Sequence, residues 1–294
     1  MNNSDPAMPL VDGVSHRWVD AGGLRMHVAE AGPADGETVL LLHGWPQHWY
    51  EWRHVVPLLS DRYRLVMPDL RGLGWTEVTK GGYEKENLAR DVFALMDALG
   101  LERVKLIGHD WGGYAGFIMC VQAPERIERF VVGNVGHLWP QPSARSALDS
   151  WRFCYQLPLV LPLIGPRATR IPGLVKKFMS GREQGVFTDA ELEAFEAPLR
   201  DPARSPSTAG YYRSFINHDL PLLMRGHWNS YRLTVPTLML YGVDDFVVRP
   251  SMLAGYEPFA DDMRIENVPD TAHFIVDAQP ALVAERALDF FEAR

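Results

Sequence analysis

The stretch Gly108-His109-Asp110-Trp111-Gly112-Gly113 places a carboxylate in a turn rich in glycine. It lies between two short apolar runs, 104–107 and 114–119, which predict a buried strand and the start of a buried helix. Because glycine has no Cβ, strand and helix can approach closely around such a bend. The residue at the bend is held in a strained backbone conformation, with its side chain above the sheet edge. We therefore expect Asp110 to be presented there as a nucleophile.

An aspartate nucleophile implies a reaction in two steps. Its carboxylate is already ionised at neutral pH and can attack an sp³ carbon to form an ester. Water must then hydrolyse that ester, and this second step needs a general base. The chain should therefore also contain a histidine, a carboxylate that orients it, and donors for the developing charge. The alternative is that Asp110 only caps the helix that follows it.

Composition excludes several classes of partner. The chain has 294 residues, enough for one large domain with an inserted lobe, and a formal net charge of −8. This charge gives no electrostatic reason to expect nucleic acid or an anionic membrane surface. The two cysteines, Cys120 and Cys154, are interpreted as reduced core thiols. Residues 1–10 lack the features of a signal peptide and no apolar run would span a bilayer, so the expected location is cytoplasmic.

Strand and helix patterns alternate along most of the chain. Besides 104–107, strands are predicted over 15–19, 24–30, 38–42, 64–67, 127–135, 236–241 and 263–268. The first two of these form a hairpin at Gly22-Gly23. Helices are predicted over 48–59, 83–99 and 280–291. This alternation favours a mostly parallel sheet that is covered by helices on both faces.

The alternation stops between residues 137 and 233. This segment is rich in proline, arginine and aromatic residues, and it contains helical patterns over 189–195 and 209–216. We interpret it as a helical lid inserted into a core made of residues 1–136 and 234–294. Ligands of open parallel sheets bind outside the carboxyl ends of the strands, which such a lid would cover.

With the turn His43-Gly44-Trp45-Pro46, the aspartate elbow, the inserted lid and a late histidine, the chain resembles the α/β-hydrolase family. More narrowly, it resembles the soluble epoxide hydrolases, from about residue 15 to the end. The resemblance implies an α/β-hydrolase fold, in which a mostly parallel central sheet is flanked by helices and carries an inserted helical cap.

The resemblance also implies a catalytic triad in the order nucleophile, acid, histidine. The acid follows the strand after the lid, three residues past a glycine, which gives Asp245, with Asp244 as the alternative. Some relatives place the acid after the strand before the lid, but Val132-Gly133-Asn134 contains no carboxylate there. The histidine is His273, which would take a proton from water while Asp245 orients its ring.

The same resemblance assigns the donors around the nucleophile. The backbone N–H groups of Trp45 and Trp111 would form the oxyanion hole. His43 and His109, which flank the site in sequence, are interpreted as structural histidines that hold the turns.

An epoxide oxygen needs an O–H donor when the ring opens, and the resemblance implies two lid tyrosines. The motifs Phe153-Cys154-Tyr155-Gln156 and Tyr211-Tyr212-Arg213 indicate Tyr155 and Tyr212, with Tyr211 as an alternative to Tyr212. The other interpretation is that these tyrosines only pack. Apolar side chains are expected to help wall a lipophilic pocket: Trp111, Trp139, Trp151, Phe153, Leu157, Phe178 and Phe215.

The predicted activity is the opening of a lipophilic epoxide to a vicinal diol, with no metal or cofactor. We expect the epoxide and water as the only ligands, no nucleic-acid partner, no membrane span, and a homodimer as one candidate assembly. The nearest rival is a haloalkane dehalogenase, in which the Trp111 indole would bind the halide, although many such enzymes carry asparagine where this chain has Trp45. A fluoroacetate dehalogenase would need arginine in place of Trp111, and a serine esterase would need serine in place of Asp110. The remaining alternative is a non-catalytic protein that binds an apolar ligand.

Overall fold

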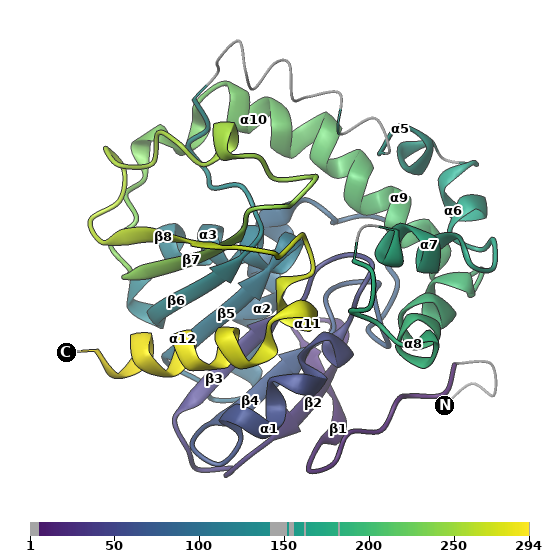
Figure 1. Cartoon of the computed structure of the whole chain (residues 1–294), viewed down its shortest axis with the longest axis horizontal. Helices are drawn as coiled ribbons and strands as arrows, with labels where there is room; N and C mark the ends of the chain where they lie inside the picture. The colour runs from purple at the N-terminus through teal and green to yellow at the C-terminus, as the bar shows by residue number, and fades with distance from the viewer. Residues whose placement is uncertain (1–5, 142–151, 153–155, 162, 182, 294) are drawn as a thin grey trace.

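An eight-stranded sheet forms the centre of the molecule (Figure 1). The structure, a computed structural model, describes residues 6–141, 152, 156–161, 163–181 and 183–293. The strands run in the order β1-β2-β4-β3-β5-β6-β7-β8. Their bounds are β1 (Ser15–Ala21), β2 (Leu24–Ala31), β3 (Thr38–Leu42), β4 (Arg64–Pro68), β5 (Val104–His109), β6 (Ile127–Gly133), β7 (Thr237–Gly242) and β8 (Met263–Val268).

Among the described strands, only β2 runs against the direction of the others. Strand β2 pairs antiparallel with β1 and β4, whereas every neighbouring pair from β4 through β3 to β8 is parallel. The predicted α/β-hydrolase fold with a mostly parallel sheet is confirmed. The strands predicted over 38–42 and 263–268 coincide with β3 and β8.

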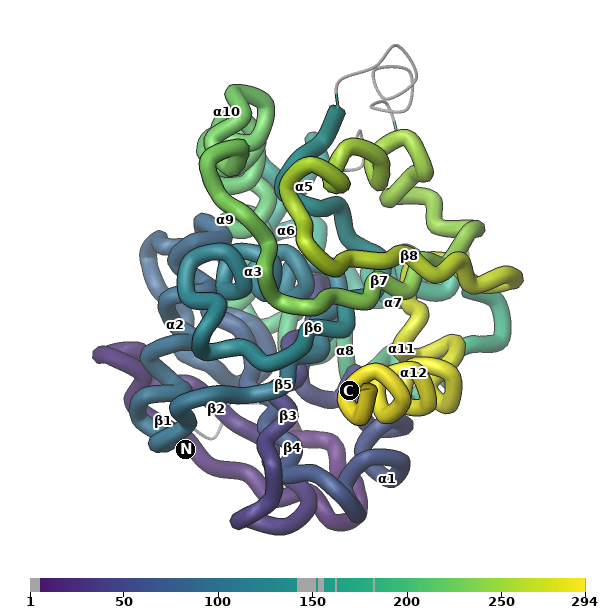
Figure 2. The backbone as a smooth tube through the Cα atoms, turned by 90° about the vertical axis from the view of Figure 1, so that its left-hand side faces the viewer, coloured from purple at the N-terminus to yellow at the C-terminus, as the bar shows by residue number. Residues whose placement is uncertain are grey.

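Alternate residues of the central strands pack into two separate apolar cores, one on each face of the sheet. In β3, Leu40 and Leu42 pack into one apolar cluster and Val39 and Leu41 into the other. The first cluster contains α2 (Lys85–Ala98) and α3 (Asp110–Gln122), and the second contains α12 (Pro280–Glu292). Figure 2 shows these helices on opposite faces of the sheet. Because side chains alternate along a strand, a continuous apolar run is what a sheet buried on both faces requires.

The helix predicted over 48–59 is wrong as a single element. The chain there forms a 3-10 helix, η1 (Trp49–His54), followed by one short turn, α1 (Val56–Leu59). Pro57 lies in the first turn of α1. Proline has no N–H to donate to the preceding turn, so a new helix starts where a continuous one would need that hydrogen bond.

Residues 137–233, which we call the inserted segment, contain helices and no strand among their described residues. Figure 1 shows these helices grouped above and to the right of the sheet. The longest, α8 (Asp189–Arg200), begins at a capping box between Thr188 and Glu191. The other helices among its described residues are α5 (Gln156–Val160), α6 (Gly165–Ala168), α7 (Leu174–Ser180), α9 (Ser205–Ser214), the π-helix η4 (Phe215–Asp219), α10 (Leu220–Met224) and η5 (His227–Ser230).

Three short helices complete the described core: η2 (Pro124–Arg126), η6 (Pro250–Met252) and α11 (Ile275–Ala278). Across the described ranges, no helix combines the length and the apolar character needed to cross a membrane.

Candidate active site

The turn between β5 and α3 holds Asp110 in a left-handed backbone conformation, with φ of +46°. Glycines make this turn sterically feasible. A Cβ on Gly112 would lie 2.2 Å from the carbonyl oxygen of Leu42, and a Cβ on Gly44 would lie 2.4 Å from the Cβ of Asp110. Side chains at these two positions would therefore push β3 and its following turn away from the aspartate.

The Asp110 carboxylate accepts a hydrogen bond at one of its oxygens. The backbone N–H of Trp45, in the turn after β3, donates to Oδ2 over 2.9 Å. Trp111 follows Asp110 in the first turn of α3, where backbone N–H groups have no partner within the helix. The structure thus brings both predicted oxyanion-hole residues beside Asp110, and it shows the contact for Trp45.

His273 and Asp245 lie side by side after the last two strands. The Nδ1 atom of His273 is 2.9 Å from Oδ2 of Asp245. Asp245 is fully buried, whereas Asp244 is exposed, so the geometry separates the two neighbours that the sequence left open. Burial opposes ionisation of Asp245, but His273 and several N–H donors outweigh it and hold the pKa of that carboxyl below its usual range. Burial likewise opposes protonation of His273, but the charge of Asp245 raises the pKa of the imidazole above 6.5.

His273 also faces the aspartate of the elbow. Its Nε2 atom lies 4.0 Å from Oδ1 of Asp110, which is too long for a direct hydrogen bond. Because Nδ1 faces the carboxylate of Asp245, the neutral ring carries its proton there and leaves Nε2 as a proton acceptor. This arrangement suits a base that acts through a water molecule.

Asn134 holds the Asp245 carboxylate in place, a role that the sequence did not reveal. Its side-chain N–H groups donate to Oδ2 of Asp245 over 2.8 Å and to the carbonyl of Ala272 over 2.9 Å. Its Oδ1 accepts the backbone N–H of Gly242. Asn134 has φ of +41°, a conformation that asparagine tolerates better than most residues. It directly follows β6, at the position that was also considered for the acid from the sequence, and that position was the available signal.

The two flanking histidines hold backbone turns. His43 accepts the N–H of Leu70 at Nε2. Nε2 of His109 lies 2.9 Å from the carbonyl oxygen of His273 and donates to it. Its Nδ1 lies 2.9 Å from a carboxylate oxygen of buried Glu51, although the two are not aligned for a hydrogen bond. Burial alone would lower the pKa of His109, but Glu51 outweighs it and raises this pKa to about 9.

Tyr212, and not Tyr211, lies over the elbow. The ring of Tyr212 packs edge-on against Trp45 and Trp111, with centroid distances of 5.2 and 5.8 Å. Tyr211 instead donates its hydroxyl hydrogen to the carbonyl of Arg71 over 3.0 Å. Two adjacent residues of α9 thus serve different contacts, one at the site and one in the interface with the core.

The structure places some of the expected pocket residues near the site and others away from it. Phe215 and Phe178 lie near the site, with ring centroids 5.0 Å from Trp111 and 5.3 Å from Trp45 respectively. Trp139 stacks on Phe259 and donates its indole N–H to Trp228, so its contacts are those of a packing residue. Leu157 on α5 is 60 % exposed, more than the wall of an enclosed pocket would show. Tyr155, Phe153 and Trp151 lie outside the described residues.

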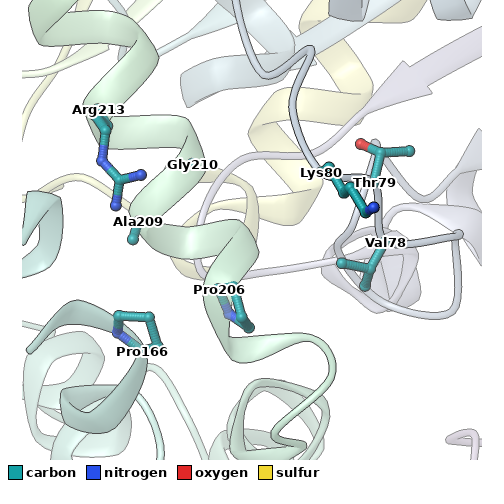
Figure 3. A pocket seen from close by; sticks show the side chains of 8 residues that line it. All are labelled: Val78, Thr79, Lys80, Pro166, Pro206, Ala209, Gly210 and Arg213. Carbon is teal, nitrogen blue, oxygen red and sulfur yellow. The ribbon is translucent and has the colours of Figure 1, made fainter. Parts of the chain in front are cut away.

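A groove of about 370 Å³ lies against α9 (Figure 3). Its lining includes Pro206, Ala209, Gly210 and Arg213 of α9, together with Val78, Thr79, Lys80 and Pro166. The α9 residues share one face by their helical spacing, and the lining includes neither Tyr212 nor any other residue placed around Asp110. This groove is therefore separate from the site around Asp110.

Comparison with known proteins agrees with this architecture. Residues 37–157 match the family model described as the alpha/beta hydrolase fold. An epoxide hydrolase 1 of Siraitia grosvenorii is 30 % identical, over 80 % of this chain and 82 % of its own length. The soluble epoxide hydrolase of Corynebacterium sp. (strain C12) is 28 % identical, over 95 % of this chain and 97 % of its own.

A solved structure shares nearly the whole fold. The crystal structure of an epoxide hydrolase from Vigna radiata superposes with a TM-score of 0.80 at 26 % identity, covering 97 % of this chain and 99 % of that one. The chain belongs to the α/β-hydrolase family. Within that family it is similar to proteins named epoxide hydrolases.

Proposed function

We propose that the protein is an epoxide hydrolase that converts a lipophilic epoxide to a vicinal diol through an ester on Asp110. The observation that carries the proposal is the convergence at Asp110 of the Trp45 N–H, the His273–Asp245 pair and the Tyr212 ring. The similarity to proteins named epoxide hydrolases supports the choice of substrate class.

In the first step, Oδ1 of Asp110 attacks a ring carbon, because Oδ2 is engaged by the Trp45 N–H. A new C–O bond forms as the ring C–O bond breaks, and its electron pair moves to the epoxide oxygen. We propose that this oxygen takes a proton from Tyr212, with Tyr155 as a second donor. An O–H donor near the nucleophile distinguishes this chemistry from the displacement of a halide.

In the second step, water hydrolyses the ester at the carboxyl carbon. His273 takes a proton from water at Nε2, and Asp245 stabilises the resulting imidazolium. The hydroxide adds to Cγ of Asp110 and charge develops on Oδ2, where the N–H groups of Trp45 and Trp111 would stabilise it. Collapse of this intermediate breaks the bond to the alkyl oxygen, which leaves as the second diol hydroxyl with the proton from His273. The regenerated Asp110 carboxyl then gives up the proton it kept from water, which returns the Tyr212 phenolate to the phenol.

The inserted segment would act as the lid over this reaction. It supplies Tyr212 and Phe215, which pack on Trp45 and Trp111 of the core. These aromatic walls exclude water and favour an apolar substituent on the epoxide.

Dehalogenation of an alkyl halide is the second candidate, and one observation favours it. The indole N–H of Trp111 is buried and has no hydrogen-bond partner within the described residues. Such a donor beside the nucleophile would bind a departing halide. The indole N–H of Trp45 is not free to assist, because it donates to the Thr208 hydroxyl over 3.0 Å. Of the two tryptophans shown beside Asp110 in the described part of the chain, Trp111 alone offers an unengaged indole N–H, which makes this the weaker candidate.

Intact-mass spectrometry of a His273→Gln variant separates these functions. Without the base, the ester on Asp110 should accumulate after mixing with aryl or alkyl epoxides, and the adduct should equal the whole mass of the epoxide. An adduct formed only from bromoalkanes, lighter than the reagent by HBr, would identify a dehalogenase. The variant Asp110→Asn/His273→Gln is the matched control and should form no adduct. No adduct on His273→Gln with any reagent would contradict catalysis through Asp110.

A further inference from the structure

Lys85 is a fully buried cation that the proposed chemistry leaves unused. It is the first residue of α2, and its Nζ donates to the carbonyl of Tyr211 over 3.0 Å and to the hydroxyl of Ser214 over 3.4 Å. Oδ2 of Asp219 lies 3.4 Å away. A buried ammonium destabilises the folded protein unless it is paired and hydrogen-bonded. These three partners come from the inserted segment, whereas Nζ also donates to the carbonyl of Tyr83 in the core over 3.2 Å, so Lys85 joins that segment to the core.

The ammonium also contacts the residue that follows the nucleophile. Nζ lies 4.3 Å from the ring centroid of Trp111 and 5.8 Å from that of Phe215. A desolvated cation over an indole face is attracted by the negative face of the ring. The same Trp111 ring packs edge-on against Tyr212. Lys85 therefore helps to fix the position of Tyr212 indirectly, by holding the Trp111 ring against which Tyr212 packs.

A second connection reaches Tyr212 through the backbone. The Tyr211 carbonyl that accepts from Lys85 belongs to the same peptide group as the backbone nitrogen of Tyr212. In addition, Oδ1 of Asp219 accepts the backbone N–H of Lys85 over 3.2 Å. Glu84 gives α2 no side-chain cap in the described structure, so Asp219 fills that place from the inserted segment.

We propose that Lys85 is a positioning residue that, with Asp219 as its counter-ion, fixes Tyr212 and the Trp111 ring over Asp110 for ring opening. The inference rests on the proposed function, because it assigns Tyr212 as the proton donor. Lys85 would therefore act in the first step, formation of the ester, and not in its hydrolysis. The base of the second step, His273, is held instead by Asp245, which Asn134 supports.

The charge on Lys85 gives the role a pH signature. Burial lowers the pKa of this lysine to about 8, against the opposing pull of Asp219. The ammonium is present below this pKa and is lost as pH rises through it, so ester formation should slow above pH about 8. The charged and titratable groups around it are Asp219 with its neighbour His218, Asp110, Glu84 and the Tyr211 phenol.

The test separates the two steps in single-turnover stopped-flow experiments, following tryptophan fluorescence with one aryl epoxide. Lys85→Met should slow ester formation about 100-fold, the loss expected when a reacting group is displaced by about 1 Å. Ester hydrolysis should stay within about threefold of the wild-type rate, and the fall above pH 8 should disappear. Lys85→Arg, which keeps the charge, should recover part of the rate. Lys80→Met, at an exposed position, is the matched control and should change neither step.

A milder variant covers the case in which Lys85→Met does not fold. Asp219→Asn removes the carboxylate that raises the pKa of Lys85, so the fall in ester formation should move to lower pH. An unmoved pH limb in Asp219→Asn, or equal slowing of both steps in Lys85→Met, would overturn the inference. Wild-type protein that forms no ester with any epoxide would instead refute the proposed function.

Discussion

Replacing Asp245 with asparagine should preserve ring opening and block ester hydrolysis. The carboxylate of Asp245 accepts at Oδ2 from His273 and Asn134, at 2.9 and 2.8 Å. It accepts at Oδ1 from the backbone N–H groups of Val247 and Val248, at 2.6 and 3.1 Å. All four partners are donors, so the amide nitrogen of an asparagine would face donors in either orientation. Facing His273, it favours the tautomer with its proton on Nε2, which cannot accept from water.

The expected magnitude follows from this geometry. An unsatisfied buried donor costs about 1–3 kcal/mol of stability. The corresponding aspartate-to-asparagine change in a serine protease, where the histidine also takes the wrong tautomer, lowers kcat by about 10⁴. We therefore expect ester hydrolysis in Asp245→Asn to fall about 10³- to 10⁴-fold. Ester formation needs no base and should stay within about threefold of wild type.

Rapid-quench mass spectrometry measures both steps in one experiment, because the ester on Asp110 should accumulate in Asp245→Asn. The matched control is Asp244→Asn, which changes the exposed neighbour and should turn over like wild type. Wild-type hydrolysis in Asp245→Asn, or ester accumulation in Asp244→Asn, would refute the assignment of the acid.

Three further predictions concern the same site. Tyr212→Phe should slow ester formation at least about 100-fold, whereas Tyr211→Phe should mainly lose about 1 kcal/mol of stability with its hydrogen bond to Arg71. Single-turnover rates and thermal unfolding measure the two effects, and the reverse ranking of the variants would contradict the geometry. The rate of ester hydrolysis should fall as pH drops through a pKa above 6.5, because Asp245 raises the pKa of His273 and only the neutral ring accepts a proton. A pH–rate profile with its acid limb below pH 6.5 would contradict this assignment of the base. Gly44→Ala should abolish ester formation and cost about 1–3 kcal/mol of stability, since its Cβ would lie 2.4 Å from that of Asp110; a normal rate would argue against this close packing.

Local patterns predicted the frame of the molecule well. Strands β3 and β8 have the predicted bounds, since a short apolar run between turn residues has one stable environment in a covered sheet. The elbow was also predictable from local sequence, because only glycine fits where β3 and β5 meet the start of α3. The prediction of one helix over 48–59 was wrong because it rested on the spacing of apolar residues. It gave too little weight to Pro57, which has no N–H to donate to the preceding turn.

Contacts between distant segments could not be derived from sequence. Tyr211 and Tyr212 are adjacent, and only the rotation of α9 against the core decides which of them meets Trp45 and Trp111. Lys85 and Asp219 are 134 residues apart, and no local pattern pairs them. A lysine at a helix start usually indicates a solvated residue, and its complete burial follows only from packing of the inserted segment.

A single turnover in H₂¹⁸O tests most directly whether Asp110 forms the ester. With enzyme in excess over epoxide, water should attack the carboxyl carbon of Asp110, so the first diol should contain no heavy oxygen. The label should instead be found in the peptide that carries Asp110. Heavy oxygen in the first diol, with an unlabelled Asp110 peptide, would show direct attack of water on the epoxide and would contradict the account.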